Sequence, residues 1–282
     1  MLGSRYEKKK HMALNGGEGR AQYKPAKRSL GQNFLADANI ARKIVDSLDI
    51  QPGDNVLEIG PGRGALTRHI LNRRPGRFMV LEKDDDLAQA LTAQYPSIEL
   101  VAGDALAFPW QTLEPEAGWK IVGNLPYNIA SPLIWDIVSQ AALSAAVFMV
   151  QLEVGQRLKA PHGGKDYGAL SVWVQSHARV ELLFKVPPQV FHPQPKVTSA
   201  VMRFFLLPRQ LDQDTAKALA ATLRMCFQQR RKQLGTILKS KGIVGAEELL
   251  QGLGIQPAQR PETLEPERFQ ALSNRLGNQF GS

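Results

Sequence analysis

The chain has 282 residues, of which 43% are hydrophobic and 22% are charged, and its formal net charge is +9; this composition is typical of a globular protein with one large domain or two smaller ones. The sequence has no apolar run of the roughly 18 residues that a membrane helix needs and no signal-peptide core, so we expect a cytoplasmic protein. It has a single cysteine, Cys226, and no Cys/His cluster with metal-ligand spacing, so we expect no disulfide and no metal. We also expect a monomer. The positive charge favours a polyanionic partner, most often nucleic acid.

Residues 1–23 are polar, Gly-rich and without hydrophobic periodicity, which predicts a mobile basic arm. His11-Met12 looks like a cloning junction, so part of this arm would be an expression scar. Apolar residues then recur at helical spacing from Ile40 to Leu48. The stretch "QPGDNVLEIG" that follows indicates a turn, a short buried strand and a Gly-rich turn.

Predicted strands and helices alternate from this point to residue 151. Further strands are predicted at Arg77–Leu81, Ile98–Val101, Lys120–Val122 and Ala145–Gln151. The helices between them are predicted at Ala65–Arg73, Asp85–Tyr95 and Ser131–Leu143. Alternation at these lengths predicts a parallel, doubly wound sheet with right-handed crossovers.

The pattern changes after a further helix and the loop "HGGKDYG". Two β-rich runs, "VELLFKV" and "TSAVMRFFLL", are joined by "PPQVFHPQPK". A parallel crossover needs about a dozen residues or more, so these two strands should be antiparallel neighbours. Helical periodicity follows from Leu219 to Leu238, and Pro266 opens a final helix. We therefore predict an α/β domain over residues 24–206 and a small helical domain over residues 207–282.

A glycine-rich turn, "VLEIGPGRGA", joins a predicted strand to a predicted helix. Taken alone, it also fits the dinucleotide fingerprint, with Glu82 at the spacing expected for a ribose hydroxyl, so an NAD-dependent oxidoreductase is one alternative. A pyrophosphate disfavours nearby carboxylates, whereas S-adenosylmethionine carries a sulfonium and an ammonium. Glu58, Glu82 and Asp104 belong to the ends of successive strands, and together they favour S-adenosylmethionine.

The stretch "NLPYNIASPL" begins at Asn124, directly after an apolar run. Pro126 and Pro132 remove two backbone donors and stiffen the loop, which would hold Asn124 and Tyr127 where a strand ends. The Asn124 side-chain oxygen and the Leu125 carbonyl are both hydrogen-bond acceptors at this point of the chain. Tyr127 offers a flat face on which a base can stack.

Several motifs in order resemble the ribosomal RNA adenine dimethyltransferases, and most closely their bacterial small-subunit branch. They are "GQNFL", "VLEIGPGRGALT", "LEKD", "AGDAL", "VGNLPYNIASPL", "EVGQRL", "DYGALSV", "VFHPQPKVTSAV" and "QQRRKQL". The resemblance runs from about Lys24 to the C-terminus. It implies a Rossmann-like class I S-adenosylmethionine-dependent methyltransferase sheet with an antiparallel final strand pair, followed by a small all-helical C-terminal domain.

The resemblance also implies roles for individual residues. Asn33 and Leu35 would close over the cofactor, S-adenosylmethionine. The cofactor site would be lined by Gly60, Glu82, Asp104 and Asn124. Asn124, Leu125 and Tyr127 would hold the target adenine, with Phe191 on its other face. Phosphate contacts are expected from four basic residues of the C-terminal quarter, Arg224, Arg230, Arg231 and Lys232.

The implied reaction is dimethylation of the N6 amines of two adjacent adenosines in a hairpin loop near the 3′ end of 16S ribosomal RNA. The partner would be 16S ribosomal RNA within the small ribosomal subunit, and the role would be in the biogenesis of that subunit. Two further alternatives are a resistance-type methyltransferase of 23S ribosomal RNA and a non-catalytic RNA-binding factor on the same fold. The intact "NLPY" constellation favours an enzyme.

Overall fold

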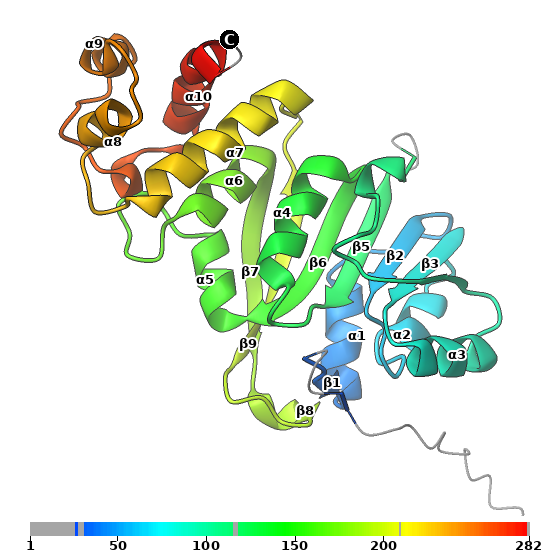
Figure 1. Ribbon diagram of the computed structural model, residues 1–282. Coiled ribbons are helices and arrows are strands. Elements are labelled where there is room, and N and C mark those ends of the chain that lie inside the picture. The colour runs from blue at the N-terminus through cyan, green and yellow to red at the C-terminus, as the bar shows by residue number, and fades with distance from the viewer. Residues whose placement is uncertain (1–25, 28–30, 115–117, 209, 281–282) are drawn as a thin grey trace, which may run out of the picture.

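The computed structural model describes residues 26–27, 31–114, 118–208 and 210–280. At its centre lies a seven-stranded sheet with the strand order β4-β3-β2-β5-β6-β9-β7 (Figure 1). Its strands are β2 (Asn55–Ile59), β3 (Arg77–Glu82), β4 (Glu99–Ala102), β5 (Trp119–Asn124), β6 (Leu143–Gln151), β7 (Ala178–Val186) and β9 (Ser199–Leu206).

Five neighbouring strands of the sheet, in the order β4-β3-β2-β5-β6, pair in parallel, as their alternation with helices predicts. Strand β9 runs antiparallel to both of its neighbours, β6 and β7. The prediction of an antiparallel pair from the short Pro-rich connection is therefore confirmed. The structure adds that β9 lies between β6 and β7, which leaves β7 at the edge of the sheet.

Helices cover both faces of the sheet, because its central strands are apolar on both sides. The helices are α1 (Ala38–Asp46), α2 (Thr67–Leu71) and α3 (Asp85–Gln94) over one face, and α4 (Ala130–Gln140), α5 (Leu152–Leu158) and α6 (Ala169–His177) over the other. Helix α1 begins where the Asp37 carboxylate accepts hydrogen bonds from the amides of Asn39 and Ile40.

The C-terminal quarter is helical, as predicted, and lies beyond α6 at the β7 end of the molecule (Figure 1). Its helices are α7 (Gln213–Gln228), α8 (Leu234–Ser240), α9 (Ala246–Gly252) and α10 (Pro266–Phe280). The described residues also include the short 3₁₀ helices η2 (Trp110–Thr112) and η4 (Pro188–Val190) in the sheet domain, and η5 (Pro261–Thr263) before α10. One hydrophobic cluster runs from the central strands through α6 into these helices, so the apolar core is continuous across residue 207.

Two short strands form a separate antiparallel pair, β1 (Phe34–Leu35) with β8 (Phe191–His192). Leu35 pairs with Phe191, and the amide of Ala36 donates to the carbonyl of Val190 at 2.8 Å. The pair joins the "GQNFL" segment to the Pro-rich loop before β9. Neither strand was predicted from the sequence, because two residues are too few to show a period.

In the part of the chain that the structure describes, no helix is long and apolar enough to cross a membrane. The predicted arm over residues 1–23 lies outside the described residues.

Candidate active site

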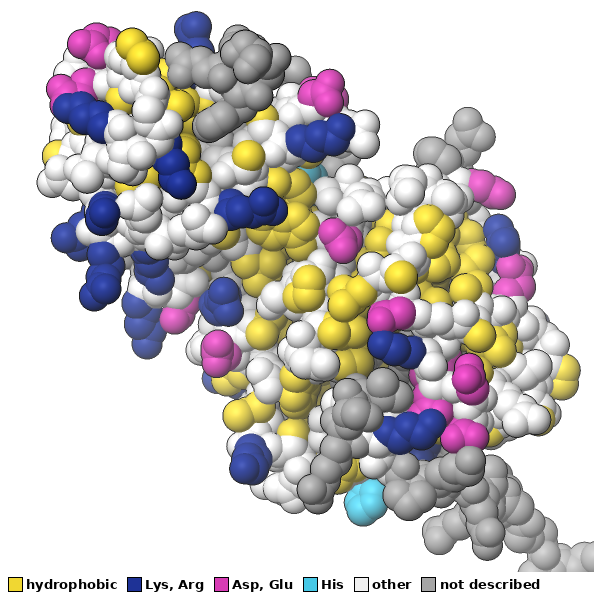
Figure 2. All heavy atoms as spheres, in the orientation of Figure 1, with side chains coloured by type: hydrophobic (Ala, Val, Ile, Leu, Met, Phe, Trp, Pro, Cys, Tyr) yellow, Lys and Arg dark blue, Asp and Glu magenta, His cyan; other side chains and the backbone are white. Residues whose placement is uncertain are grey.

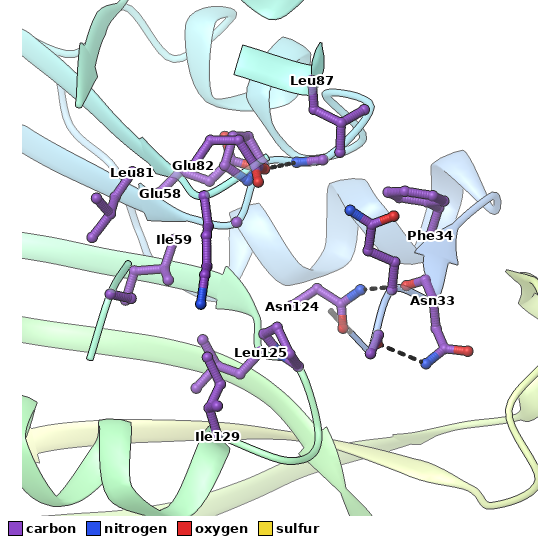
Figure 3. A pocket seen from close by; sticks show the side chains of 18 of the residues that line it. Asn33, Phe34, Glu58, Ile59, Leu81, Glu82, Leu87, Asn124, Leu125 and Ile129 are labelled. Atoms are coloured by element: carbon purple, nitrogen blue, oxygen red, sulfur yellow. Dashed lines mark hydrogen bonds between the residues drawn. The ribbon is translucent and has the colours of Figure 1, made fainter. Parts of the chain in front are cut away.

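A cavity of about 160 Å³ opens at the edge of the sheet where the parallel strands end. The carboxyl ends of parallel strands meet at one edge, so side chains distant in sequence converge there. β2, β3 and β5 bring Glu58, Glu82 and Asn124 to the cavity, and the "GQNFL" segment lies across from them (Figure 3).

The glycine turn after β2 forms one wall of this cavity. Gly60 and Gly62 have φ values of +61° and +58°, a region that strains any residue with a Cβ atom. A Cβ on Gly62 would also come within 3.0 Å of the Phe34 ring. Gly103 follows β4 and also lines the cavity. A Cβ on Gly60 or on Gly103 would meet nothing within 4 Å, so both positions face open space. Gly60 and Gly103 therefore leave room for a ligand in the cavity.

Three carboxyl groups line the cavity in different environments. Glu58 is only 1% exposed and accepts a hydrogen bond from the Thr67 hydroxyl at 2.7 Å; burial raises its pKa to about 8. Glu82 accepts from the amides of Gly62 at 3.1 Å and Asp84 at 2.9 Å, and burial raises its pKa too. Asp104 differs, because its hydrogen bond with the Lys83 ammonium at 2.7 Å lowers its pKa.

This set of groups fits a cationic ligand such as S-adenosylmethionine. Among the described residues, no Lys or Arg lies within ion-pair distance of Glu58 or Glu82. Buried carboxylates are costly unless they are paired, so a ligand that brings its own positive charge is favoured there. A pyrophosphate would instead place negative charge beside two acidic side chains and would oppose the ionisation of both.

Asn124 ends β5, and its orientation is fixed by the opposite wall. Its Nδ2 donates to the main-chain carbonyl of Asn33 at 2.9 Å, which leaves its side-chain oxygen as an acceptor at the cavity (Figure 3). The next amide, that of Leu125, donates to the Met149 carbonyl of β6 at 3.1 Å. Pro126 then has no amide to continue the ladder. The sheet thus delivers the Asn124 side chain and the Leu125 carbonyl at a fixed position.

Tyr127 is half-buried and also lines the cavity. The Tyr127 hydroxyl lies 2.7 Å from the Ser199 hydroxyl, and the two groups form a hydrogen bond. Ser199 is the first residue of β9 and is fully buried. Burial raises the Tyr127 pKa, and the bond to Ser199 opposes that shift. The ring is therefore anchored through its hydroxyl, a contact that the sequence analysis did not anticipate.

Most of the predicted site residues lie around this one cavity. They are Asn33, Leu35, Gly60, Glu82, Asp104, Asn124, Leu125 and Tyr127. Phe191 is not among the residues that line it. Its ring is 4% exposed and packs in the core beside Leu35, to which its backbone pairs in β1–β8. A place for Phe191 on the far face of the base stays a prediction that this packing does not support.

Other residues that line the cavity were not predicted as site residues, and they include Gln32, Phe34, Lys83 and Ile129. Gln32 and Phe34 belong to the quoted "GQNFL" motif, and Lys83 belongs to "LEKD". These motifs were the feature of the sequence from which Gln32, Phe34 and Lys83 could have been predicted as site residues. Ile129 likewise belongs to the quoted "VGNLPYNIASPL" motif.

The predicted phosphate-contacting residues lie on the C-terminal helices, apart from the cavity. Arg224, Arg231 and Lys232 are exposed. Arg230 is half-buried; it donates to the Lys165 carbonyl at 2.9 Å, and its Nε lies 3.7 Å from Glu262. Figure 2 shows Lys and Arg side chains gathered over the lobe that these helices form. Within the described residues, no group of three His, Cys, Asp or Glu side chains could hold a metal ion.

Comparison with known proteins shows the family to which the chain belongs. The family model described as "Ribosomal RNA adenine dimethylase" matches residues 24–278. "Ribosomal RNA small subunit methyltransferase A" of Maridesulfovibrio salexigens is 52% identical over 257 residues, which cover 91% of this chain and 98% of the relative.

Two crystal structures extend the likeness to the fold. A dimethyladenosine transferase from Plasmodium falciparum has a TM-score of 0.72 at 25% identity, covering 88% of this chain and 98% of that one. The 23S rRNA methyltransferase ErmE has a TM-score of 0.64 at 27% identity, covering 86% and 99%. The predicted methyltransferase fold, with its antiparallel end and helical C-terminal quarter, is confirmed. The chain belongs to the ribosomal RNA adenine dimethylase family, and it is an S-adenosylmethionine-dependent enzyme.

Proposed function

We propose that this enzyme dimethylates the N6 amines of two adjacent adenosines in a hairpin loop near the 3′ end of 16S ribosomal RNA. It would act as a cytoplasmic monomer on the small ribosomal subunit, as a step in the biogenesis of that subunit. The observation that carries the proposal is the position of Asn124, whose amide nitrogen is bound to Asn33 while its oxygen lies at a cavity lined by buried carboxyls.

The exocyclic amine of adenine is a poor nucleophile, because its lone pair is delocalised into the ring. Two acceptors, the Asn124 side-chain oxygen and the Leu125 carbonyl, would orient the two N–H groups so that the lone pair points out of the ring plane. Both acceptors gain strength as the nitrogen becomes positive, so they stabilise the transition state more than the ground state. S-adenosylmethionine, when bound, supplies the electrophilic methyl group.

The other residues of the site would bind either the cofactor or the target base. Glu82 would accept from the ribose hydroxyls of the cofactor, Asp104 from its adenine amino group, and Glu58 would balance its positive charge. Tyr127, anchored by Ser199, would stack on the target base. No general base is needed, because the methylated amine is an acidic ammonium that loses its proton to solvent. Positioning and electrostatics therefore account for the mechanism.

A base that enters this cavity must be unstacked, which favours a hairpin loop over a duplex. The exposed cations Arg224, Arg231 and Lys232 would hold phosphates of the same RNA. A resistance-type action on 23S ribosomal RNA is the second candidate, since ErmE shares the fold; its 27% identity, against 52% for the small-subunit relative, makes it the weaker one.

Incubation with labelled methyl donor and unmethylated small subunits tests the proposal. We expect label at two adjacent adenosines near the 3′ end of 16S ribosomal RNA, and two methyl groups on each. Large subunits and naked 23S ribosomal RNA are the matched controls. Label on 23S ribosomal RNA alone would establish the resistance-type activity instead, and no label on either RNA would refute both candidates.

A further inference from the structure

The segment Gly31–Ala36, here called the strap, lines the cavity through residues 31–35, across from the strand ends (Figure 3). It lies beside the glycine turn, here the cofactor side, and beside Asn124, here the base side. On the cofactor side, the Phe34 ring packs against Gly62, and the Arg63 guanidinium lies 4.4 Å from the ring centre. On the base side, Asn33 accepts the hydrogen bond from Asn124. A ligand that fills the cavity would therefore touch the strap and the sheet edge at once.

The strap is tied down outside the cavity by Asp84, whose side chain is only 3% exposed. Its two carboxylate oxygens accept from the Lys27 ammonium at 2.6 Å and from the Gln32 side-chain amide at 2.9 Å. Gln32 is bound a second time, because its oxygen accepts from the Lys27 main-chain amide at 2.7 Å. Lys27, Gln32 and Asp84 thus each contact the other two, and this group of three residues is here called the clasp.

The clasp connects directly to the cofactor wall. The amide of Asp84 donates to Glu82 at 2.9 Å, and the other oxygen of Glu82 accepts from Gly62 in the glycine turn. Asp84 also caps α3, since it accepts from the Asp86 amide at 3.2 Å. Lys27 does not line the cavity. The Lys27 ammonium also lies 3.2 Å from the Asp86 carboxylate in the first turn of α3. Any effect of Lys27 on a ligand in the cavity must therefore pass through Gln32, Asp84 or Asp86.

We propose that Lys27 and Asp84 are positioning residues that hold the strap across the cofactor cavity and thereby set how fast the cofactor and its product exchange. The inference rests on the proposed function. Dimethylation of one adenosine consumes two methyl donors, so the product must leave and a new donor must enter between the two transfers. A clasp made of an exposed cation and a buried acid suits that cycle, because the ammonium can rehydrate each time the strap opens.

The expected size of the effect follows from the exposure of Lys27, which is 41%. Solvent screens such a pair, and partly exposed ion pairs contribute modestly. We expect Lys27→Met to speed dissociation of S-adenosylhomocysteine about two- to fivefold, roughly the change that a partly exposed ion pair produces. Lys27→Arg keeps the charge and a donor to Asp84, so it should restore most of the wild-type rate.

The experiment compares Lys27→Met, Lys27→Arg and a control, Lys239→Met, in the full chain. Lys239 pairs with Glu247 on the C-terminal helices, so the control removes the same charge and one ion pair far from the cavity. The first readout is the dissociation rate of labelled S-adenosylhomocysteine chased with unlabelled ligand. The second is hydrogen exchange of the peptide that contains residues 31–36 in the free protein, with a peptide of β2 as internal reference.

We expect faster dissociation and faster exchange in the strap for Lys27→Met only, with β2 unchanged. The Michaelis constant for the methyl donor should rise, while the single-turnover rate at saturating donor stays within about twofold of the wild type. Equal dissociation and exchange in Lys27→Met and Lys239→Met would overturn the clasp and leave the proposed function standing. If the wild type binds neither ligand, the proposed function fails, and strap exchange in the free protein alone decides whether the clasp exists.

Discussion

Asn124 is held through its amide nitrogen, and its oxygen is left for a substrate amine. Asn124→Ala should therefore lower the methyl-transfer rate by about 10²–10³, the loss found when one transition-state hydrogen bond is removed. RNA affinity, made mostly through phosphates, should change little. The measurement is single-turnover methylation at saturating methyl donor, because Asn124 also ties down the strap through Asn33.

Asn72→Ala is a suitable control, since Asn72 is an exposed asparagine at the end of α2, away from the cavity. It should retain the wild-type rate. A rate for Asn124→Ala within about tenfold of this control would show that Asn124 is not the acceptor on which the chemistry depends.

Tyr127 allows its ring and its hydroxyl to be tested apart. Tyr127→Phe keeps the stacking face but leaves the buried Ser199 hydroxyl without its partner, a loss of about 1–3 kcal/mol in stability. Methylation should stay within about tenfold of wild type, whereas Tyr127→Ala should lose more, because base stacking is worth about 1–3 kcal/mol. Thermal denaturation and single-turnover rates give the two quantities.

The double variant Tyr127→Phe with Ser199→Ala removes both hydroxyls and should recover part of the lost stability. If Tyr127→Phe slows methylation as much as Tyr127→Ala, then the anchored hydroxyl matters for catalysis and the stacking account is wrong.

At the scale of elements, the basic residues after α7 separate into two kinds. Arg231 and Lys232 are exposed, and in the described structure neither makes an ion pair. Replacing both by Gln should weaken RNA binding and flatten its salt dependence by about 0.7–0.9 per lost phosphate contact in the log–log slope. Arg73→Gln with Arg74→Gln removes the same charge near α2, at the other end of the sheet (Figure 1), and should leave the slope unchanged. Equal slopes for both double variants would make Arg231 and Lys232 mere surface charges.

Arg230 should behave differently from its neighbours, because its guanidinium binds the Lys165 carbonyl and lies beside Glu262. It joins the α5–α6 loop to η5. Arg230→Gln should therefore lower the melting temperature by a few degrees, as expected for a loss of about 1 kcal/mol, and change the salt slope little. A full unit lost from the slope with no change in melting temperature would assign Arg230 to RNA instead.

Helices and strands with a clear hydrophobic period could be predicted from the sequence, and contacts between segments distant in the sequence could not. The alternation of β2 to β6 with helices and the short Pro-rich connection fixed the parallel core and the antiparallel end. The site residues followed from motifs at strand ends. β1 and β8 are too short to show a period, and the bond from Lys27 to Asp84 spans 57 residues. The burial of Phe191 comes from that same β1–β8 pairing.

At the scale of the whole molecule, the helices proposed to hold RNA are fixed relative to the cavity. The fully buried Tyr167, in the α5–α6 loop, donates through its hydroxyl to the Leu264 carbonyl at 2.7 Å. The Gly163 amide donates to the Glu262 carbonyl at 2.6 Å. Because the apolar core is also continuous across residue 207, deleting the C-terminal helices would uncover buried side chains such as Leu219 and Phe269. Charge substitutions therefore test RNA binding more cleanly than truncation, and the division at residue 206 stays a proposal.

Glu58 makes the stability of the whole molecule depend on pH. Burial raises its pKa in the folded protein to about 8, from an ordinary value of 4.5, so between those values the folded state binds more protons than the unfolded one. The stabilising contribution of the protonated carboxyl is complete below about pH 4.5 and is lost as pH rises towards 8, by up to about 1.4 kcal/mol per pH unit. Glu58→Gln mimics the protonated form and keeps an acceptor for Thr67.

The free energy of unfolding of Glu58→Gln should therefore exceed that of the wild type increasingly from pH 6 to pH 9, measured by urea denaturation without ligand. Other titrating groups are common to both proteins and cancel in the difference. Saturating S-adenosylmethionine should stabilise the wild type more than the variant at pH 9, because the ligand's positive charge favours the ionised carboxylate. A difference between the two proteins that stays constant from pH 6 to pH 9 would show that Glu58 is already ionised in the free protein, and the cavity would then have to balance that charge by a group other than the ligand.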